Sequence, residues 1–365
     1  MAEAKGGLDG VVVADTSLSL VDGEAGRLIL AGHEIESLAG RVSFEDICHL
    51  LWGGRLPSAA ERQELQRALG RGRTQAFALL DRLGDALDAP NGMDALRAAA
   101  AHLGEADGAE GRTLLTAAVA VFAAAWARLR NGAPPLAPDP DLGHAADYLR
   151  MSTGGAAAER TAGLDSYLVT VAEHGMNAST FAARVVTSTG SDAVSAVVAA
   201  IGTLKGPLHG GAPGPVLDML DAIARPEVAE AWLEAELLAG RRIMGMGHRV
   251  YRVRDPRAAV LERALERLEG AAPRSPRLTL ARAVERAAEA ALRRRHPGRE
   301  LHANVEFYTA VLLEAIGLGR ELFTPTFTVG RVAGWLAHVQ EQRALGRLIR
   351  PTARYVGPRP EPMSA

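Results

Sequence analysis

Two glycine-flanked histidines are the residues of this chain with the clearest capacity for chemistry. One lies in Gly206-Pro207-Leu208-His209-Gly210-Gly211 and the other in Gly245-Met246-Gly247-His248-Arg249-Val250-Tyr251. Because glycine has no Cβ, a ligand or a second backbone segment can come close to each imidazole. Proline fixes one dihedral of the first turn and removes an amide donor. The repeated arrangement favours histidines that face a ligand over histidines that only pack in the interior.

One carboxylate is well suited to act as a base. Glu306 lies in Asn304-Val305-Glu306-Phe307-Tyr308, where its apolar neighbours would exclude water and raise its pKa. A carboxylate of raised basicity is what the removal of a proton from carbon requires. Three arginines, Arg257, Arg331 and Arg350, carry paired N–H donors that would clamp a small dicarboxylate if they converge.

A metal site is the competing use of the histidines. His174, His209 and His248 are dozens of residues apart, and the chain has no His-Glu-x-x-His motif and no second cysteine. A serine nucleophile lacks support because no Gly-x-Ser-x-Gly elbow occurs. We therefore expect no metal. Outside the motifs, we expect Arg184 to form a structural ion pair and His338 to pack between helices.

Composition limits the classes of function. The 365 residues include 41 basic and 43 acidic side chains, so the net charge of −2 gives no argument for binding nucleic acid or an anionic membrane. The one cysteine, Cys48, excludes an internal disulfide and lies in an apolar helical pattern typical of core packing. No secretion signal opens the chain. Residues 114–127 are too few to span a bilayer and predict a buried helix. We expect a cytoplasmic protein.

The hydrophobic pattern predicts a mostly helical chain. Residues 8–35 alternate β-branched and polar side chains, as in Val11–Ser17 and Arg27–Leu30 around a turn at Asp22–Glu24, and predict one or two short antiparallel hairpins. No strand is expected after residue 35. Helices are expected, with Ser43 and Ser58 as caps of the first two, from residue 43 onward and over about 60–86, 92–103, 110–130, 142–153, 160–173, 178–189, 191–204, 214–223, 226–239, 256–269, 277–295, 304–316 and 326–345.

In combination, these motifs resemble the citrate synthase family. Gly-Pro-Leu-His-Gly-Gly, then Gly-His-Arg-Val-Tyr, then Asn-Val-Glu-Phe-Tyr, in this order, is a specific combination. Further matches include Asp22-Gly23-Glu24 and Leu50-Leu51-Trp52, so the resemblance runs nearly end to end. The chain looks like the shorter bacterial type. The resemblance implies an all-α homodimer with a short N-terminal β-hairpin region. It also implies a large domain of residues 1–210 and 318–365 and a small domain of residues 211–317.

The resemblance also implies condensation of an acyl-CoA with oxaloacetate, with no permanently bound cofactor. His209 would stabilise the enol of the thioester, Glu306 would remove the α-proton, and His248 would protonate the oxaloacetate carbonyl. The remaining implied contacts form two groups. The oxaloacetate site would comprise His174, Asn177, Arg257, Arg331 and, from the partner subunit, Arg350. The CoA site would comprise Ile243, Met244, Gly245, Met246, Gly247 and Arg252.

The chain departs from the family pattern at its expected base. The family usually has aspartate where this chain has Glu306, and a misplacement of about 1 Å can cost on the order of 10²-fold in rate. His302-Ala303, Pro213-Gly214 and Glu173 also differ from common family residues. Three alternatives stay open: a 2-methylcitrate synthase that uses propionyl-CoA, a catalytically weak helical dimer with a sensing or binding role, and a metal-dependent lyase.

Overall fold

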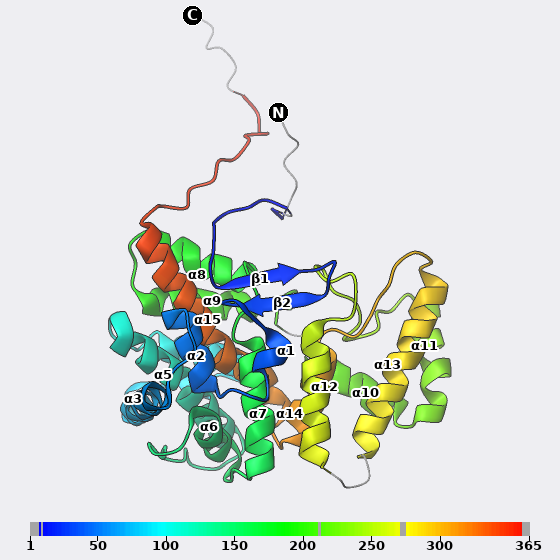
Figure 1. The fold of residues 1–365 in the computed structure, drawn as a ribbon, viewed down its shortest axis with the longest axis horizontal. Helices are drawn as coiled ribbons and strands as arrows, with labels where there is room; N and C mark the ends of the chain where they lie inside the picture. The colour runs from blue at the N-terminus through cyan, green and yellow to red at the C-terminus, as the bar shows by residue number, and fades with distance from the viewer. Residues whose placement is uncertain (1–6, 9, 211–212, 271–274, 360–365) are drawn as a thin grey trace, which may run out of the picture.

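The computed structural model describes residues 7–8, 10–210, 213–270 and 275–359 and is mostly helical (Figure 1). The strands are β1 (Ser19–Asp22), β2 (Arg27–Leu30) and β3 (His33–Glu34). The helices of the first half are α1 (Ile35–Leu38), α2 (Phe44–Gly53), α3 (Ala59–Phe77), α4 (Gly92–Ala100), α5 (Gly108–Arg130), α6 (His144–Thr153), α7 (Ala158–Val171), α8 (Ala178–Ser188) and α9 (Ala193–Leu204). Those of the second half are α10 (Pro213–Ile223), α11 (Ala229–Leu238), α12 (Pro256–Glu269), α13 (Pro276–Arg295), α14 (Val305–Ala315) and α15 (Phe323–Leu345). Short 3-10 turns are η1 (Leu80–Arg82), η2 (Ala86–Asp88), η3 (Pro226–Val228) and η4 (Arg320–Leu322).

A small antiparallel sheet of order β1-β2-β3 precedes the helices. The expected turn at Asp22–Glu24 and the strand at Arg27–Leu30 are confirmed, with Asp22 paired to Arg27. The expectation for Val11–Ser17 is wrong, because β1 begins only at Ser19. Val12 is 84% exposed, so the alternation in that segment has no buried face to specify a strand.

Two capping boxes begin α2 and α3, as the sequence predicts. Ser43 accepts from the Asp46 amide, and Ser58 accepts from the Glu61 amide, with the carboxylate reciprocating in each case. The helix expected over 60–86 is wrong at its end, because α3 stops at Phe77 and two 3-10 turns follow. Gly84, with φ of +55°, takes the chain out of the helical region between these turns.

The interior of the helical body is built on α5, α7 and α15. Over residues 115–127 every side chain of α5 is buried, as the alanine-rich pattern predicts. By length and apolar content alone α5 is the one helix of the described chain that could cross a membrane, yet 72% of that window is buried inside the protein. It is therefore accounted for as a core helix. Cys48 is also fully buried, which confirms its packing role.

Helix α15 begins at Phe323, three residues before the expected start. Pro325 suggests a helix boundary in the sequence, but it occupies the first turn, where an amide has no acceptor within the helix. The helix then continues to Leu345, and most of its side chains are buried. This long buried helix carries Arg331 into the interior.

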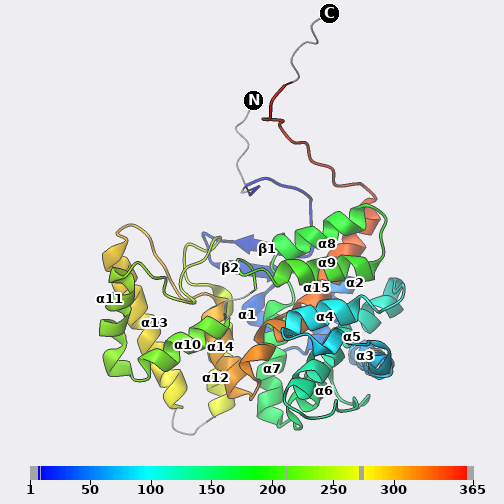
Figure 2. The ribbon, with the colours of Figure 1, turned by 180° about the vertical axis from the view of Figure 1, so that it is seen from behind.

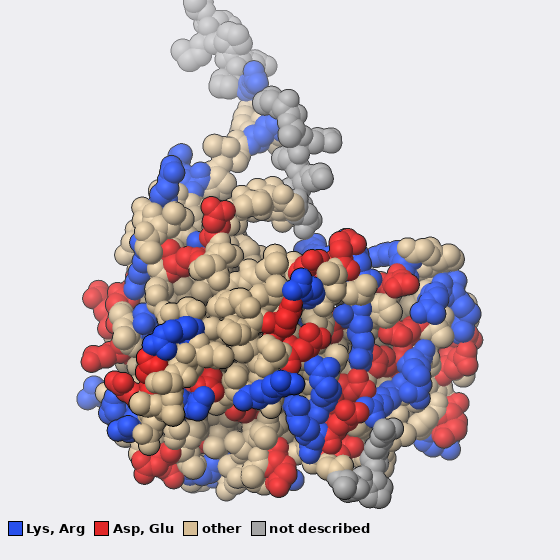
Figure 3. Space-filling view, in the orientation of Figure 1, with Lys and Arg blue, Asp and Glu red and all other residues tan. Residues whose placement is uncertain are grey.

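Helices α10, α11 and α13 lie at one side of the molecule, and α12 and α14, which pack against each other, both contact α7 of the body (Figures 1 and 2). In Figure 3, basic and acidic side chains are interspersed over this side. Residues 346–359 extend from the end of α15 away from the body. The predicted site histidines lie in loops between helices, whereas Arg257, Glu306 and Arg331 lie in α12, α14 and α15.

Candidate active site

Three of the predicted site histidines lie in loops that follow or precede buried helices. His174 follows α7, His209 follows α9, and His248 lies in the loop before α12. The rings of His174 and His248 have centroids 5.7 Å apart in an edge-on arrangement. Tyr251 packs against both, at 5.7 Å and 4.7 Å, and its hydroxyl lies 3.1 Å from His174 Nε2. The fold therefore brings together loops separated by more than seventy residues.

The hydrogen bonds of His248 determine which ring nitrogen carries the proton. The backbone amides of Val250 and Tyr251 both donate to Nδ1 at 3.0 Å, so Nδ1 is an acceptor and the proton is on Nε2. Burial, followed by the Arg257 charge, lowers the His248 pKa to about 4, so the ring is neutral at pH 7. Nε2 lies 3.3 Å from an Arg257 terminal nitrogen. A neutral ring accepts at one nitrogen only, so the two shorter amide contacts make Nδ1 the acceptor, and the longer Arg257 contact brings two donors together instead of forming a hydrogen bond.

His209 is held by Ser179 of α8. Its Nε2 lies 2.9 Å from the Ser179 hydroxyl and 3.3 Å from the Ser179 amide. Trp335 donates to that hydroxyl at 3.1 Å, and the hydroxyl donates its one proton to Asn177 Oδ1 at 2.8 Å, so these contacts hold the ring without fixing which of its nitrogens carries the proton. Burial and then the Arg331 charge lower the His209 pKa to about 4. His209 is thus a neutral donor. Gly211 of the same motif lies outside the described residues.

Glu306 lies in the first turn of α14, which is tied to the loop before His248. Asn304 caps the helix by accepting from the Glu306 amide at 3.0 Å and donates to the Gly247 carbonyl at 2.8 Å. Burial raises the Glu306 pKa to about 7, with Arg257 lowering it and Asp255 raising it. Within the described chain no side chain donates to this carboxylate. A carboxylate that titrates near neutral pH and has no donor is suited to act as a base.

The two buried arginines near the histidines have different surroundings. Arg257 donates to Asp255 from Nε at 3.1 Å and from a terminal nitrogen at 2.8 Å. Arg331 donates from Nε to the Val171 carbonyl at 2.6 Å, and in the described residues no carboxylate accepts from its guanidinium. Both charges act on His174, whose pKa burial and then these arginines hold far below its usual value. The charges therefore converge on the same region as the imidazoles.

The expected CoA segment runs beside the start of α14. Ile243 is buried, and Met244 and Met246 are partly buried. Gly245 and Gly247 have φ of +73° and +82°, and Met246 forms an antiparallel bridge with Ala303. The Arg252 side chain is exposed, while its amide donates to the Gly23 carbonyl at 2.9 Å.

Two predicted substrate residues have other surroundings. Asn177 caps α8 and accepts from the Thr180 amide at 3.1 Å, while its Nδ2 donates to the Gly175 carbonyl, so its polar atoms shape the loop. Arg350 is exposed in the segment that leaves the body after α15. This single chain does not pair Arg350 with another described side chain.

Sequence reasoning missed Ser179, Tyr251 and Asp255 as members of the site. Asp255 caps α12, pairs with Arg257, and accepts from the Val305 amide at 3.1 Å, so it joins the starts of α12 and α14. The Asp-Pro pair before a helix was the available signal for this cap. Tyr251 ends the Gly-His-Arg-Val-Tyr motif, and that position was its signal. Ser179 has no comparable signal, because single hydroxyl residues are common in loops and helices.

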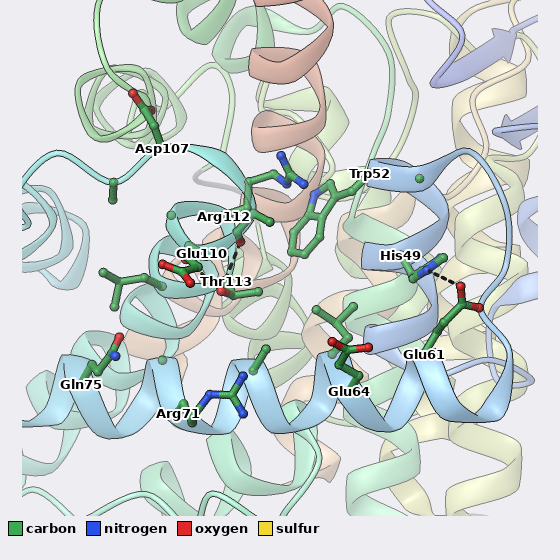
Figure 4. A pocket seen from close by; sticks show the side chains of 18 of the residues that line it. His49, Trp52, Glu61, Glu64, Arg71, Gln75, Asp107, Glu110, Arg112 and Thr113 are labelled. Carbon is green, nitrogen blue, oxygen red and sulfur yellow. Dashed lines mark hydrogen bonds and ion pairs between the residues drawn. The ribbon is translucent and has the colours of Figure 1, made fainter.

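A cavity lies elsewhere, between α2, α3 and the start of α5 (Figure 4). It encloses about 810 Å³ and is lined by Trp52, Glu64, Arg71, Glu110 and Arg112 among others, with no predicted site residue. Its size alone does not make it the site, because the convergent histidines and perturbed carboxylate are absent from it. Across the described ranges, no three His, Cys, Asp or Glu side chains group as metal ligands.

Comparison with known proteins identifies the family. Residues 7–352 match the family model described as citrate synthase, C-terminal domain. The citrate synthase of Haloferax volcanii is 39% identical, over 97% of this chain and 96% of that protein. The 2-methylcitrate synthase of Mycobacterium tuberculosis is also 39% identical, over 97% and 91%.

Solved structures agree. The citrate synthase of Thermotoga maritima aligns with a TM-score of 0.86 and 34% identity, over 99% of this chain and 98% of that chain. A ternary complex of the Thermoplasma acidophilum citrate synthase with carboxymethyl coenzyme A and oxaloacetate aligns with a TM-score of 0.87 and 26% identity, over 100% and 99%. The chain therefore belongs to the citrate synthase family and is an enzyme of that type, a transferase.

Proposed function

We propose that the enzyme condenses acetyl-CoA with oxaloacetate and water to give citrate and free CoA. The observation that carries this proposal is the Glu306 carboxyl, with a pKa raised to about 7, in a region that also holds two neutral histidine donors and two buried arginines. The α-proton of a thioester is much less acidic than a carboxyl group, so a base removes it only if the developing enolate oxygen is stabilised at once.

Each histidine has its own role. Glu306 takes the α-proton of the thioester while a ring N–H of His209 hydrogen-bonds to the thioester carbonyl oxygen and stabilises the enolate. The enolate carbon then attacks the ketone carbon of oxaloacetate, and the Nε2 proton of His248 passes to the ketone oxygen. The proton held by Glu306 returns to His248 through solvent, which restores both groups. Water finally cleaves the citryl thioester and releases CoA. Losing one such preset donor typically costs about 10²–10³ in rate.

Arginine side chains would hold oxaloacetate, and a loop backbone would hold CoA. His174, Arg257 and Arg331 would bind oxaloacetate, with Arg350 of the partner subunit completing the site in a homodimer. Asn177 would shape the same loop. The backbone of 243–247 would face the adenine of CoA, and the exposed Arg252 would reach a phosphate.

The proposal includes two domains, residues 1–210 with 318–365 and residues 211–317. Closure of one onto the other would keep water from the acyl intermediate. A cytoplasmic location and the absence of a permanently bound cofactor belong to the same proposal.

A second candidate function is a 2-methylcitrate synthase that uses propionyl-CoA. It is favoured by the mycobacterial 2-methylcitrate synthase, which is as similar to this chain as the haloarchaeal citrate synthase. One methylene in an apolar pocket changes discrimination by only about 1–3 kcal/mol. The sequence similarity therefore does not separate the two donors.

The test measures free thiol released with oxaloacetate and either acyl-CoA. The larger kcat/KM identifies the donor. Glu306→Gln and His209→Ala should each lower kcat by at least about 10² with either donor. Turnover no higher than background with both donors would instead support the catalytically weak dimer. Loss of activity on adding a chelator would support the metal-dependent lyase.

A further inference from the structure

One face of α15 packs on the backbone that leads to His174. Arg331, Gly334 and His338 follow a spacing of three and four residues, so they lie on one side of the helix. Arg331 donates to the Val171 carbonyl. A Cβ added to Gly334 would lie 2.2 Å from the Ala172 carbonyl oxygen and 2.6 Å from Glu173 Oε2. The helix thus meets residues 171–173 at close range.

The Glu173 carboxylate joins the three segments that meet here, which are the His174 loop, β1 and α15. It is fully buried, and its Oε1 accepts from the Gly175 amide at 2.6 Å, from the Ser19 hydroxyl at 2.9 Å and from His338 Nε2 at 3.1 Å. The Gly175 amide belongs to the residue directly after His174, and Gly175 has φ of +64°. The carboxylate therefore holds the backbone conformation that follows His174, a conformation that glycine adopts without strain.

The proton of His338 is fixed by a second buried charge. Arg184 on α8 lies 3.0 Å from His338 Nδ1, and arginine can only donate. Nδ1 is therefore an acceptor, and Nε2–H donates to Glu173. Arg184 also pairs with Glu341 and donates to Gln342, which confirms its expected structural ion pair. His338 is buried between α15 and α8, as expected.

The second carboxylate oxygen of Glu173, Oε2, accepts no hydrogen bond from the described residues, although it is buried. The Glu173 charge is nevertheless the main negative charge that acts on buried Arg331, opposing burial and the Arg257 charge. A buried guanidinium with no bonded carboxylate depends on such a nearby counter-charge.

Resting on the proposed function, we infer that Glu173 is a positioning residue for oxaloacetate binding. It orients the His174 loop through the Gly175 amide and supplies the counter-charge of Arg331. Arg184 and His338 hold Glu173 from α8 and α15, and Ser19 holds it from β1. Glu173 itself touches no substrate in this arrangement.

The test compares three variants with the wild-type enzyme. Glu173→Gln keeps the size and one acceptor oxygen but removes the charge, and Ser19→Ala removes one donor to Oε1 with little change in volume. Asp147→Asn is the matched control, since Asp147 pairs with Arg73 and both side chains are fully buried away from these loops. For each, oxaloacetate Kd is measured by titration, together with KM for both substrates and Tm.

Glu173→Gln should raise the oxaloacetate Kd and KM about tenfold or more and leave the acyl-CoA KM within about twofold. Ser19→Ala should raise the oxaloacetate Kd about threefold. Asp147→Asn should lower Tm and leave the oxaloacetate Kd unchanged. Removing the Glu173 charge should also move the alkaline loss of oxaloacetate affinity to lower pH, because Arg331 would then face only Arg257 and Tyr167.

Wild-type oxaloacetate affinity in folded Glu173→Gln would overturn the inference, as would an equal loss of affinity in Asp147→Asn. If Glu173→Gln does not fold, Ser19→Ala decides, and unchanged affinity there overturns it. Failure of the wild-type protein to bind oxaloacetate would be a failure of the proposed function, which this design detects separately.

Discussion

The two buried arginines of the site are held in opposite ways. Arg257 is 3% exposed and pairs through two nitrogens with Asp255, two residues before it. Arg331 is 1% exposed, donates to a backbone carbonyl, and takes its nearest negative charge from Glu173 in a distant loop. Burial lowers both pKa values, but Asp255 outweighs it and raises that of Arg257, whereas the Arg331 pKa falls to about 10.

This difference separates a local half of the site from a tertiary half. The local half comprises the loop before α12 and the start of α14, which share Asp255. The tertiary half comprises the His174 loop, α15 and β1, which meet at Glu173. A local pair keeps its partner even when neighbouring elements shift. The tertiary half depends on the packing of three separate segments. A substitution in any of them, even one far from the substrates, should therefore change its geometry.

Asp255→Asn should give the largest effect, because it breaks the local half. Arg257 would stay buried without a full counter-charge, which typically costs about 3–5 kcal/mol of stability. We expect kcat/KM for oxaloacetate to fall by about 10² or more. Since Asp255 raises the Glu306 pKa, its neutralisation should also move the acid limb of kcat/KM to lower pH. Chemical denaturation and pH-rate profiles measure these effects.

Asp147→Asn again serves as the control for burial. It should cost comparable stability without moving the acid limb. An Asp255→Asn enzyme with wild-type kcat/KM would show that the bidentate pair does not organise the local half.

Much of the local half could be predicted from the sequence. Glycines beside His248, the Asp-Pro-Arg order at 255–257 and the Asn cap before Glu306 each place a functional residue near a recognisable turn or helix start. Helix positions followed from apolar periodicity for the same reason, since caps and periodicity are short-range features. The end of α3 and the start of α15 were misplaced, because apolar periodicity does not distinguish the 3-10 turns after Phe77 from a continued α-helix, and because a proline can occupy the first turn of a helix.

The tertiary half could not be predicted in this way. Ser19, Glu173 and His338 are more than 150 residues apart at each step, and no spacing rule connects them. The interval of Arg331, Gly334 and His338 does indicate a shared helix face, but it does not identify what that face contacts. Only the packing of α15 on residues 171–173 reveals it.

The acid limb of the pH profile of kcat/KM should report on the local half, which contains Glu306. With the Glu306 pKa at about 7, kcat/KM should fall about tenfold per unit as pH drops below 7, because a protonated carboxyl cannot accept the α-proton. From pH 7 to pH 5 the loss is about 50-fold, because half of the Glu306 carboxyl groups are already protonated at pH 7. His209 and His248, with pKa values of about 4, stay neutral over this range. Initial rates at low acyl-CoA concentration measure the limb, and a flat profile between pH 5 and 7 would exclude Glu306 as the base.

Gly23→Ala should have an effect of about tenfold on kcat/KM, because the N-terminal hairpin contacts both halves. A Cβ on Gly23 would lie 2.3 Å from the Val250 carbonyl oxygen, in the segment that orients His248. On the other half, a Cβ on Gly175 would lie 3.2 Å from Val21 of β1. Displacing a catalytic loop by about 1 Å costs on the order of 10²-fold at most.

Gly104→Ala is the matched control, because an added Cβ there meets no atom within 4 Å. Equal kcat/KM in the two variants would show that the hairpin does not hold the His248 segment.

Ser179→Ala should give the smallest effect and concerns how the two imidazoles are held. His248 receives two backbone amides, which no side-chain substitution removes, whereas His209 depends partly on the Ser179 hydroxyl. The variant retains the Ser179 amide at 3.3 Å from Nε2, so we expect kcat to fall only about threefold. Oxaloacetate Kd should be unchanged, because His209 faces the thioester. Nitrogen NMR of the His209 ring should show different chemical shifts in the variant and the wild type, because the variant loses the 2.9 Å contact of Nε2 with the hydroxyl. Unchanged shifts with wild-type kcat would show that the hydroxyl does not hold His209.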